Sequence, residues 1–169
     1  LHRALRHDPG GHDAGHGFLN VLLATVRAVA GAGADEVVAT LEDRENNQGT
    51  VAIAREGNVA AMVQLKSETD FAGKSEDFVE LVQKMADAVL ADGETGIDKL
   101  SDELDTLRVA KRENIEVGTV VRFEAGADSV LDTYLHRQDG RGVNGVLLEI
   151  VGADAEAVRE IALHIAFAK

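Results

Sequence analysis

The segment TVAIAREGNVAAMVQL, residues 50–65, carries the clearest structural pattern in this chain. It consists of two apolar runs, Thr50–Arg55 and Val59–Leu65, which are joined by the short link EGN at residues 56–58. Two such runs around a glycine-containing link of this length are typical of a β-hairpin. The sequence therefore predicts a sheet that begins near Gln48, where the hydrophobic period changes.

Helical patterns follow the hairpin. An amphipathic helix is predicted to begin near Ser75, a residue type that favours the N-cap position. Its apolar residues fall on one helical face: Phe78, Leu81, Val82, Met85 and Val89. After the glycines at 93 and 96, a second helix is predicted from apolar residues at three- and four-residue spacing: Ile97, Leu100, Leu104 and Leu107.

The third block is extended. Three runs are predicted to form strands: Glu116–Glu124, Ser129–His136 and Gly142–Val151. The last of them is almost unbroken valine, leucine and isoleucine, as expected for a central strand. Asp154 is predicted to cap a final helix. Because helices and strands come in blocks rather than in strict alternation, the predicted fold class is α+β, with a mainly antiparallel sheet packed with helices.

The first 45 residues differ from the rest in composition and in hydrophobic pattern. Residues 1–17 are rich in histidine, glycine and aspartate and are predicted to be an irregular lead-in. Residues 18–30 and 34–44 show helical spacing and are predicted to form two helices. We therefore expect a small N-terminal helical module in residues 1–45 and an α+β core in residues 46–169.

Charge and composition exclude several classes of function. The formal net charge is −13 and no cluster of lysine and arginine interrupts it, so we expect no direct contact with nucleic acid. The chain has no cysteine, which excludes disulfides, thiolate zinc sites and cysteine nucleophiles. The longest apolar stretch, residues 18–34, is too short and too interrupted to span a membrane, and we expect none to be involved.

A further segment stands between the predicted hairpin and the first predicted helix of the core. Residues 67–78 read SETDFAGKSEDF. They resemble the signature of the elongation factor Ts family, in which Thr-Asp-Phe-Val-Ala-(Lys/Arg)-Asn links a strand to a helix. Four positions match: Thr69, Asp70, Phe71 and Lys74. Three depart from the usual Val, Ala and Asn: Ala72, Gly73 and Ser75.

Other segments resemble the same family in the same order. They are AKRENI at 110–115, TYLH at 133–136, GRGVNGVLLE at 140–149 and IALHIA at 161–166. Together the resemblance covers about residues 48–169. It does not extend to the N-terminus, because the family has a Thr-Gly-Ala-Gly-Met-Met loop where this chain has DPGGHD at 8–13.

The resemblance implies a function and a set of contact residues. Members of the family are guanine-nucleotide exchange factors that bind elongation factor Tu in the cytoplasm of bacteria or in an organelle, without a cofactor. Carried over, Phe71 would be a wedge between two helices of that GTPase, and Asp70 would perturb the groups that hold its magnesium. His136 would lie close to its phosphate-binding loop. The implied partner-binding residues are therefore Thr69, Asp70, Phe71, Lys74 and His136, with no catalytic residue and no metal ligand.

The residues alone leave alternatives open. Phe71 is alternatively the first core residue of the following helix, Asp70 its N-cap, and His136 an ordinary strand-end histidine. The alternative function is an exchange-inactive interaction or assembly module with the same fold, and formation of a homodimer stays open. An enzyme is disfavoured because no nucleophile motif and no glycine-rich phosphate loop is present.

A metal site at the N-terminus is disfavoured as well. Four histidines stand there at spacings that match no rigid metal motif: His2, His7, His12 and His16.

Overall fold

The computed structural model describes residues 22–29, 38–43 and 48–167, and contains two sheets. The first sheet has the strand order β3-β4-β5 and is antiparallel throughout. Its strands are β3 Gln48–Glu56, β4 Val59–Ser67 and β5 Glu116–Glu124. The hairpin expected at residues 50–65 is confirmed, with Glu56 paired to Val59 across the turn.

The second sheet has the order β2-β1-β7-β6. Its strands are β1 Leu22–Val29, β2 Val38–Asp43, β6 Ser129–Gln138 and β7 Arg141–Val151. Strands β6 and β7 form an antiparallel hairpin, β2 is antiparallel to β1, and β1 runs parallel to β7. Antiparallel pairing therefore predominates in the described part of the chain, with one parallel pair.

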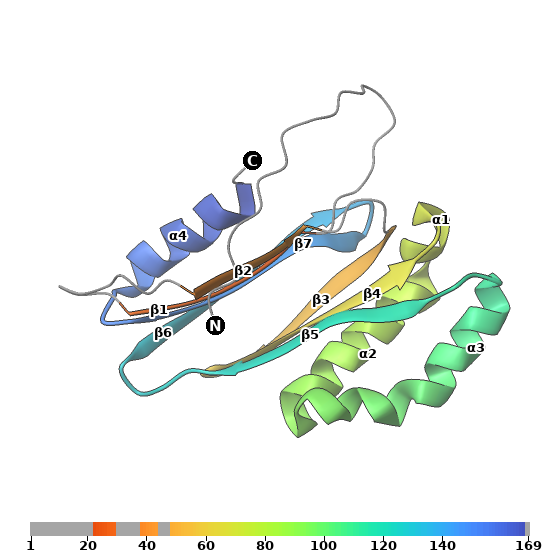
Figure 1. Cartoon of the computed structure of the whole chain (residues 1–169), viewed down its shortest axis with the longest axis horizontal. Helices are drawn as coiled ribbons and strands as arrows, with labels where there is room; N and C mark the ends of the chain where they lie inside the picture. Colours follow the sequence, from red (N-terminus) through yellow and green to blue (C-terminus); the bar gives the residue numbers. More distant parts are fainter. Residues whose placement is uncertain (1–21, 30–37, 44–47, 168–169) are drawn as a thin grey trace.

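Helices cover the outer face of each sheet. They are α1 Asp70–Gly73, α2 Glu76–Asp92, the 3-10 helix η1 Glu94–Leu100, α3 Ser101–Lys111 and α4 Ala155–Phe167. Helices α2 and α3 lie against the β3-β4-β5 sheet, and α4 lies across the β6-β7 hairpin on the opposite side of the molecule (Figure 1). The two sheets face each other in the middle.

Strand β7 is buried on both faces, which explains its continuous hydrophobic sequence. Alternate residues of a strand point to opposite faces of the sheet. Val146 and Leu148 belong to the apolar cluster with α4, whereas Leu147 packs with Val51 and Met62 of the other sheet. A Cβ placed on Gly145 would lie 2.6 Å from the sulfur of Met62, so glycine at this position allows the two sheets to approach closely.

The N-terminal part corrects one expectation. Residues 22–29 and 38–43 form strands, whereas helices were expected over 18–30 and 34–44. All eight residues of β1 pair in register with β7. This ladder satisfies the backbone polar groups of β1 along the edge of β7, and such long-range pairing outweighs a local helical periodicity.

The rest of the N-terminal expectation lies outside the described residues. The lead-in at 1–17 and the four histidines within it belong to this part of the chain. The division into a module of residues 1–45 and a core of residues 46–169 stays a prediction.

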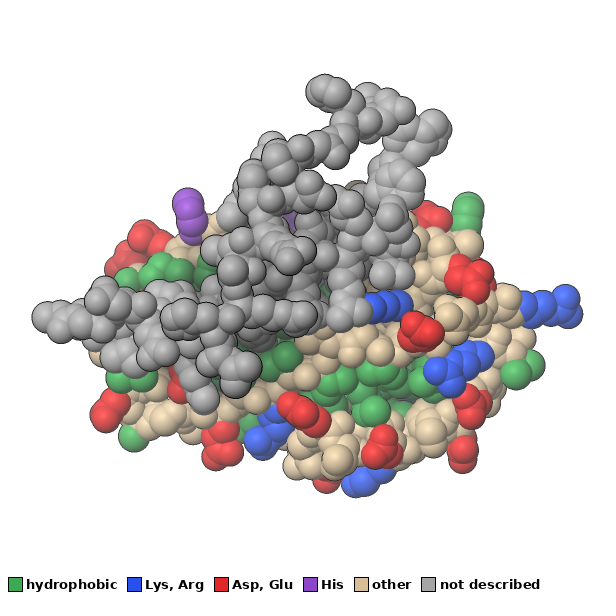
Figure 2. Space-filling view, in the orientation of Figure 1, with side chains coloured by type: hydrophobic (Ala, Val, Ile, Leu, Met, Phe, Trp, Pro, Cys, Tyr) green, Lys and Arg blue, Asp and Glu red, His purple; other side chains and the backbone are tan. Residues whose placement is uncertain are grey.

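Charged side chains of opposite sign are interspersed over α2, η1 and α3. Lys111 pairs with Asp77 at 2.7 Å, Lys99 with Asp92 at 2.9 Å and Lys84 with Glu103 at 3.1 Å. On the face seen in Figure 2, the described lysines and arginines likewise lie among aspartates and glutamates. Within the described ranges, no helix has the length and apolar character needed to cross a membrane.

Phe78 lies at the centre of the cluster between α2 and the first sheet and is fully buried. We predict that Phe78→Ala lowers the free energy of unfolding by about 3–5 kcal/mol, because the cavity that it leaves is only partly filled by relaxation. Val109→Ala is the matched control, since Val109 is 78% exposed and its truncation should change stability by less than about 0.5 kcal/mol. Urea unfolding of both variants measures the difference, and similar losses in the two would contradict this packing.

Candidate functional site

The segment with the Thr-Asp-Phe motif forms a one-turn helix, α1, between β4 and α2. Thr69 is its N-cap residue, with extended backbone angles (φ −117°, ψ 153°). The Thr69 hydroxyl oxygen accepts a hydrogen bond from the backbone N–H of Ala72 at 3.2 Å. Ser67 donates from its hydroxyl to the Thr69 carbonyl at 2.8 Å. The turn is therefore defined by its own capping bonds as well as by its neighbours.

Glu113, which follows α3, holds the entry to this turn. Its carboxylate accepts hydrogen bonds from the backbone N–H groups of Glu68 and Thr69, both at 3.1 Å, and another from the Thr69 hydroxyl. In return, the Asn114 backbone N–H donates to the Glu68 carboxylate at 2.8 Å. These bonds join two segments that lie about 45 residues apart and that both belong to the family resemblance.

Phe71 projects from this turn into solvent and is 76% exposed. The alternative that Phe71 is a core residue of the following helix is therefore wrong, because Phe78 takes the core position on α2. Asp70 is not an N-cap either. Thr69 occupies that position on α1, and Ser75 occupies it on α2, as expected from the sequence.

Lys74 lies next to both exposed groups of the turn. Its Nζ is 3.3 Å from Oδ2 of Asp70 and 4.9 Å from the centre of the Phe71 ring. Exposed ion pairs of this kind contribute little to stability, with a typical magnitude of about 0–1 kcal/mol. The structure thus brings four of the five expected site residues together: Thr69, Asp70, Phe71 and Lys74.

His136 lies elsewhere, on β6, in an aromatic cluster with Tyr134 and Phe167. The Tyr134 hydroxyl is 3.4 Å from Nδ1 of His136, and the two rings are stacked with centres 6.5 Å apart. The Phe167 and His136 rings are T-shaped to each other with a centre distance of 6.0 Å. The imidazole is half-buried between these two neighbours near the end of β6.

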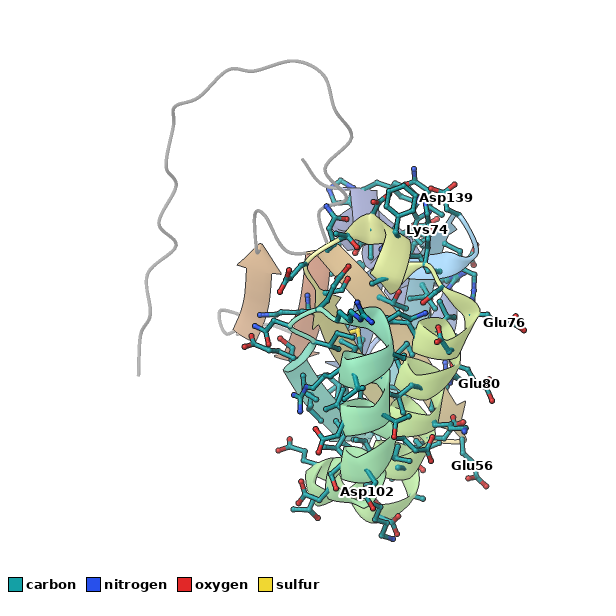
Figure 3. All side chains as sticks on the ribbon, turned by 90° about the vertical axis from the view of Figure 1, so that its right-hand side faces the viewer. Glu56, Lys74, Glu76, Glu80, Asp102 and Asp139 are labelled. Carbon is teal, nitrogen blue, oxygen red and sulfur yellow. The ribbon has the colours of Figure 1, made fainter. Side chains whose placement is uncertain are left out.

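The turn between β6 and β7 lies at the same end of the molecule as α1. Figure 3 shows Asp139 of this turn beside Lys74. A groove at this end is lined by the C-cap residue of α1 and by residues of α2 and of the hairpin: Lys74, Glu76, Val79, Glu80, Gln83, Arg137 and Gly140. The Asp70–Phe71 pair and the hairpin that carries His136 are therefore presented on neighbouring parts of one surface.

The described residues offer no apparent place for a metal ion. Within ranges 22–29, 38–43 and 48–167, no group of three or more histidine, aspartate and glutamate residues is arranged to hold one.

Comparison with known proteins gives the family. The family described as "Elongation factor TS" matches residues 68–169, from the entry of α1 to the end of the chain. The chain belongs to the elongation factor Ts family. It is 37% identical over 135 residues to elongation factor Ts of Xanthomonas campestris pv. campestris, covering 73% of this chain and 44% of that protein.

Two other relatives agree. Elongation factor Ts of Deinococcus deserti is 32% identical over 135 residues, which is 73% of this chain and 48% of that protein. That of Kineococcus radiotolerans is 33% identical over 141 residues, covering 76% and 50% respectively. The chain therefore spans about half the length of the elongation factor Ts proteins that it matches.

Sequence reasoning missed four residues that shape this surface. They are Glu113, Tyr134, Arg141 and Phe167. The first three stand within segments that resemble the elongation factor Ts family. The sequence therefore indicated their positions but not their contacts. Phe167 follows the last matching segment, and nothing in its local pattern indicates that it packs beside His136.

We predict that Glu113→Ala lowers the free energy of unfolding by about 1–2 kcal/mol, because it leaves two backbone N–H groups and a hydroxyl without their acceptor. Glu103→Ala is the matched control. Its carboxylate forms a surface ion pair with Lys84, so the loss should stay below about 1 kcal/mol. If urea unfolding gives equal losses of stability for the two variants, Glu113 contributes no more than an ordinary surface glutamate.

Proposed function

We propose that this chain is a guanine-nucleotide exchange factor that promotes GDP release from elongation factor Tu. Membership of the elongation factor Ts family supports the proposal. The observation that carries it is the exposure of Phe71, a large apolar ring on a capped turn. In this proposal the protein acts by binding alone in the cytoplasm of a bacterial-type cell, and no covalent bond is made or broken.

Exchange follows from a difference in affinity. A factor that binds the nucleotide-free GTPase more tightly than the loaded one must weaken nucleotide binding by the same ratio. A ten-thousand-fold ratio requires about 5.5 kcal/mol of differential binding. Burial of one phenylalanine side chain supplies about 1.5–3 kcal/mol of this. Because Phe71 is exposed in the free chain, this free energy is available only when a partner covers the ring.

Asp70 and Lys74 accompany Phe71 in this proposal. The carboxylate of Asp70 is neutralised by Lys74 at 3.3 Å, in a pair that lies on the surface. Since such pairs are weak, docking can separate the two charges at small cost. The freed carboxylate would then perturb the groups that hold magnesium in the GTPase, and Lys74 would meet an acidic group of the partner. Thr69 keeps the turn in place.

His136 supplies the second contact. Its Nδ1 lies next to the Tyr134 hydroxyl, and in this proposal Nε2 contacts the partner. Placed near the phosphate-binding loop of the GTPase, this group would help to displace the loop. The proposed contact residues are therefore the five that the family resemblance implies: Thr69, Asp70, Phe71, Lys74 and His136.

Stopped-flow release of a fluorescent GDP analogue from elongation factor Tu of the same organism tests the proposal. We expect the chain to accelerate release in a concentration-dependent manner, and Phe71→Ala to reduce the acceleration by about one to two orders of magnitude. Val109→Ala is the matched control, because Val109 is as exposed as Phe71 but stands on α3. It should leave the rate unchanged.

The contrary outcome is also informative. If the chain binds elongation factor Tu without accelerating release, the exchange proposal is wrong. The alternative, an interaction module that keeps the family fold, then takes its place. Such a result would draw attention to the departures from the family signature at residues 72, 73 and 75.

A separate prediction concerns His136. We expect His136→Ala to lower the maximal rate of GDP release by about tenfold, a typical effect for a contact residue at the centre of an interface. Tyr134→Phe should produce a smaller decrease, because it removes the hydroxyl beside Nδ1 but keeps the stacked ring. Titration of the rate against chain concentration measures both, and a full rate for His136→Ala would remove His136 from the contact set.

A further inference from the structure

Arg141, the first residue of β7, is fully buried although it carries a charge. Its Nη1 donates to the Gly49 carbonyl at 2.7 Å. In the described part of the molecule, its Nε and Nη2 have no hydrogen-bond partner. Burial of a guanidinium with unpaired donors is unfavourable, and most buried polar groups are hydrogen-bonded. The position of Arg141 therefore needs a reason other than stability.

The guanidinium lies directly against α1. A Cβ placed on Gly73 would come within 2.5 Å of Nη1 of Arg141 and within 3.0 Å of the Gly49 Cα. The guanidinium therefore lies close to the last residue of α1. Beside it, the Thr50 hydroxyl donates to the Gly73 carbonyl at 2.6 Å, in a buried hydrogen bond. The start of β3, the end of α1 and the start of β7 thus meet at Gly73.

The positive charge of Arg141 lies near the end of the molecule that carries α1 and the β6–β7 turn. Burial lowers the pKa of the guanidinium, and the carboxylates of Asp70 and Asp139 counteract part of that effect. An arginine remains protonated at neutral pH even so. Asp70 of α1 and Asp139 of the β6–β7 turn therefore both lie in the field of one buried positive charge.

We propose that Arg141 is a positioning residue for α1: it fixes the one-turn helix against β3 and so sets how Phe71 and Asp70 face the partner. This inference rests on the proposed exchange function. Arg141 itself, being buried, does not touch the partner. Its effect passes through Gly73 and the Gly49 carbonyl, and it links the β6–β7 hairpin to the turn that carries Phe71.

Arg141→Met separates a positioning role from a general role in stability. It removes a buried charge and two donors without partners, but it also removes the hydrogen bond to the Gly49 carbonyl. These effects oppose each other, so we expect the fold to stay intact. If Arg141 positions α1, the same substitution should loosen the turn and weaken exchange even though global stability is kept.

Arg141→Met tests this in the full chain, because it removes the guanidinium and keeps an apolar side chain of similar size. Arg55→Met is the matched control, because Arg55 also donates to a carbonyl of the other sheet, that of Leu131 at 2.8 Å, but stands near the far end of β3.

The first measurement is hydrogen exchange of the backbone amides at positions 73, 74 and 75, which donate within α1 and at its end. We expect Arg141→Met to reduce the protection of these amides about tenfold, as for the loss of a hydrogen bond to a charged donor. Amides in the middle of α2 should keep their protection, as should all of these amides in Arg55→Met.

The second measurement is GDP release from elongation factor Tu. In Arg141→Met we expect the concentration of chain that gives half-maximal release to rise about tenfold, with Arg55→Met unchanged. Unchanged protection of α1 in Arg141→Met would overturn the inference, as would full exchange activity with a loosened turn. If the native chain itself does not accelerate release, the exchange proposal fails, and hydrogen exchange still decides whether Arg141 holds α1.

Discussion

The two sheets pack against each other, and this contact limits where the helices and the connections can lie. Val51 and Met62 of one sheet meet Leu147 of the other, and Gly145 lets the backbones approach. Because the inner faces are occupied in this way, each sheet must cover its outer face with helices, α2 and α3 on one side and α4 on the other. The connections are then forced to the ends of the layers, and α1 and the β6–β7 turn come to lie at one end together.

Local sequence was sufficient for the elements whose pattern is decided by this layering. The hairpin at residues 50–65, the buried face of α2 and the continuous apolar run of β7 all follow from short-range periodicity. It was insufficient for β1, whose partner β7 lies more than a hundred residues away and whose own sequence has a helical spacing. Pairing between distant segments leaves no local signal, so the strand was missed.

The candidate site likewise has residues that local sequence groups together and contacts that local sequence does not predict. Thr69, Asp70, Phe71 and Lys74 are neighbours in sequence, and a motif was enough to group them. The spacing placed Phe78 on the buried face of the helix, but it left open whether Phe71, seven residues earlier, is buried or exposed. The contacts of Glu113 with Thr69, and of Arg141 with Gly49, join distant segments and emerge only from the fold. These contacts explain how segments that lie far apart in the chain contribute to one site.

The hydrogen bonds that join residues 68–69 to residues 113–114 affect how far the length of the segment between them can vary. Helix α2, the 3-10 helix η1 and helix α3 form a helical connection between β4 and β5, which are neighbours in the sheet. Because hydrogen bonds join the two ends of this connection, a change in its length alters the entropy of loop closure only slightly. New helices or a second domain could therefore be inserted into the connection, since the hydrogen bonds at its ends would still hold α1 in place.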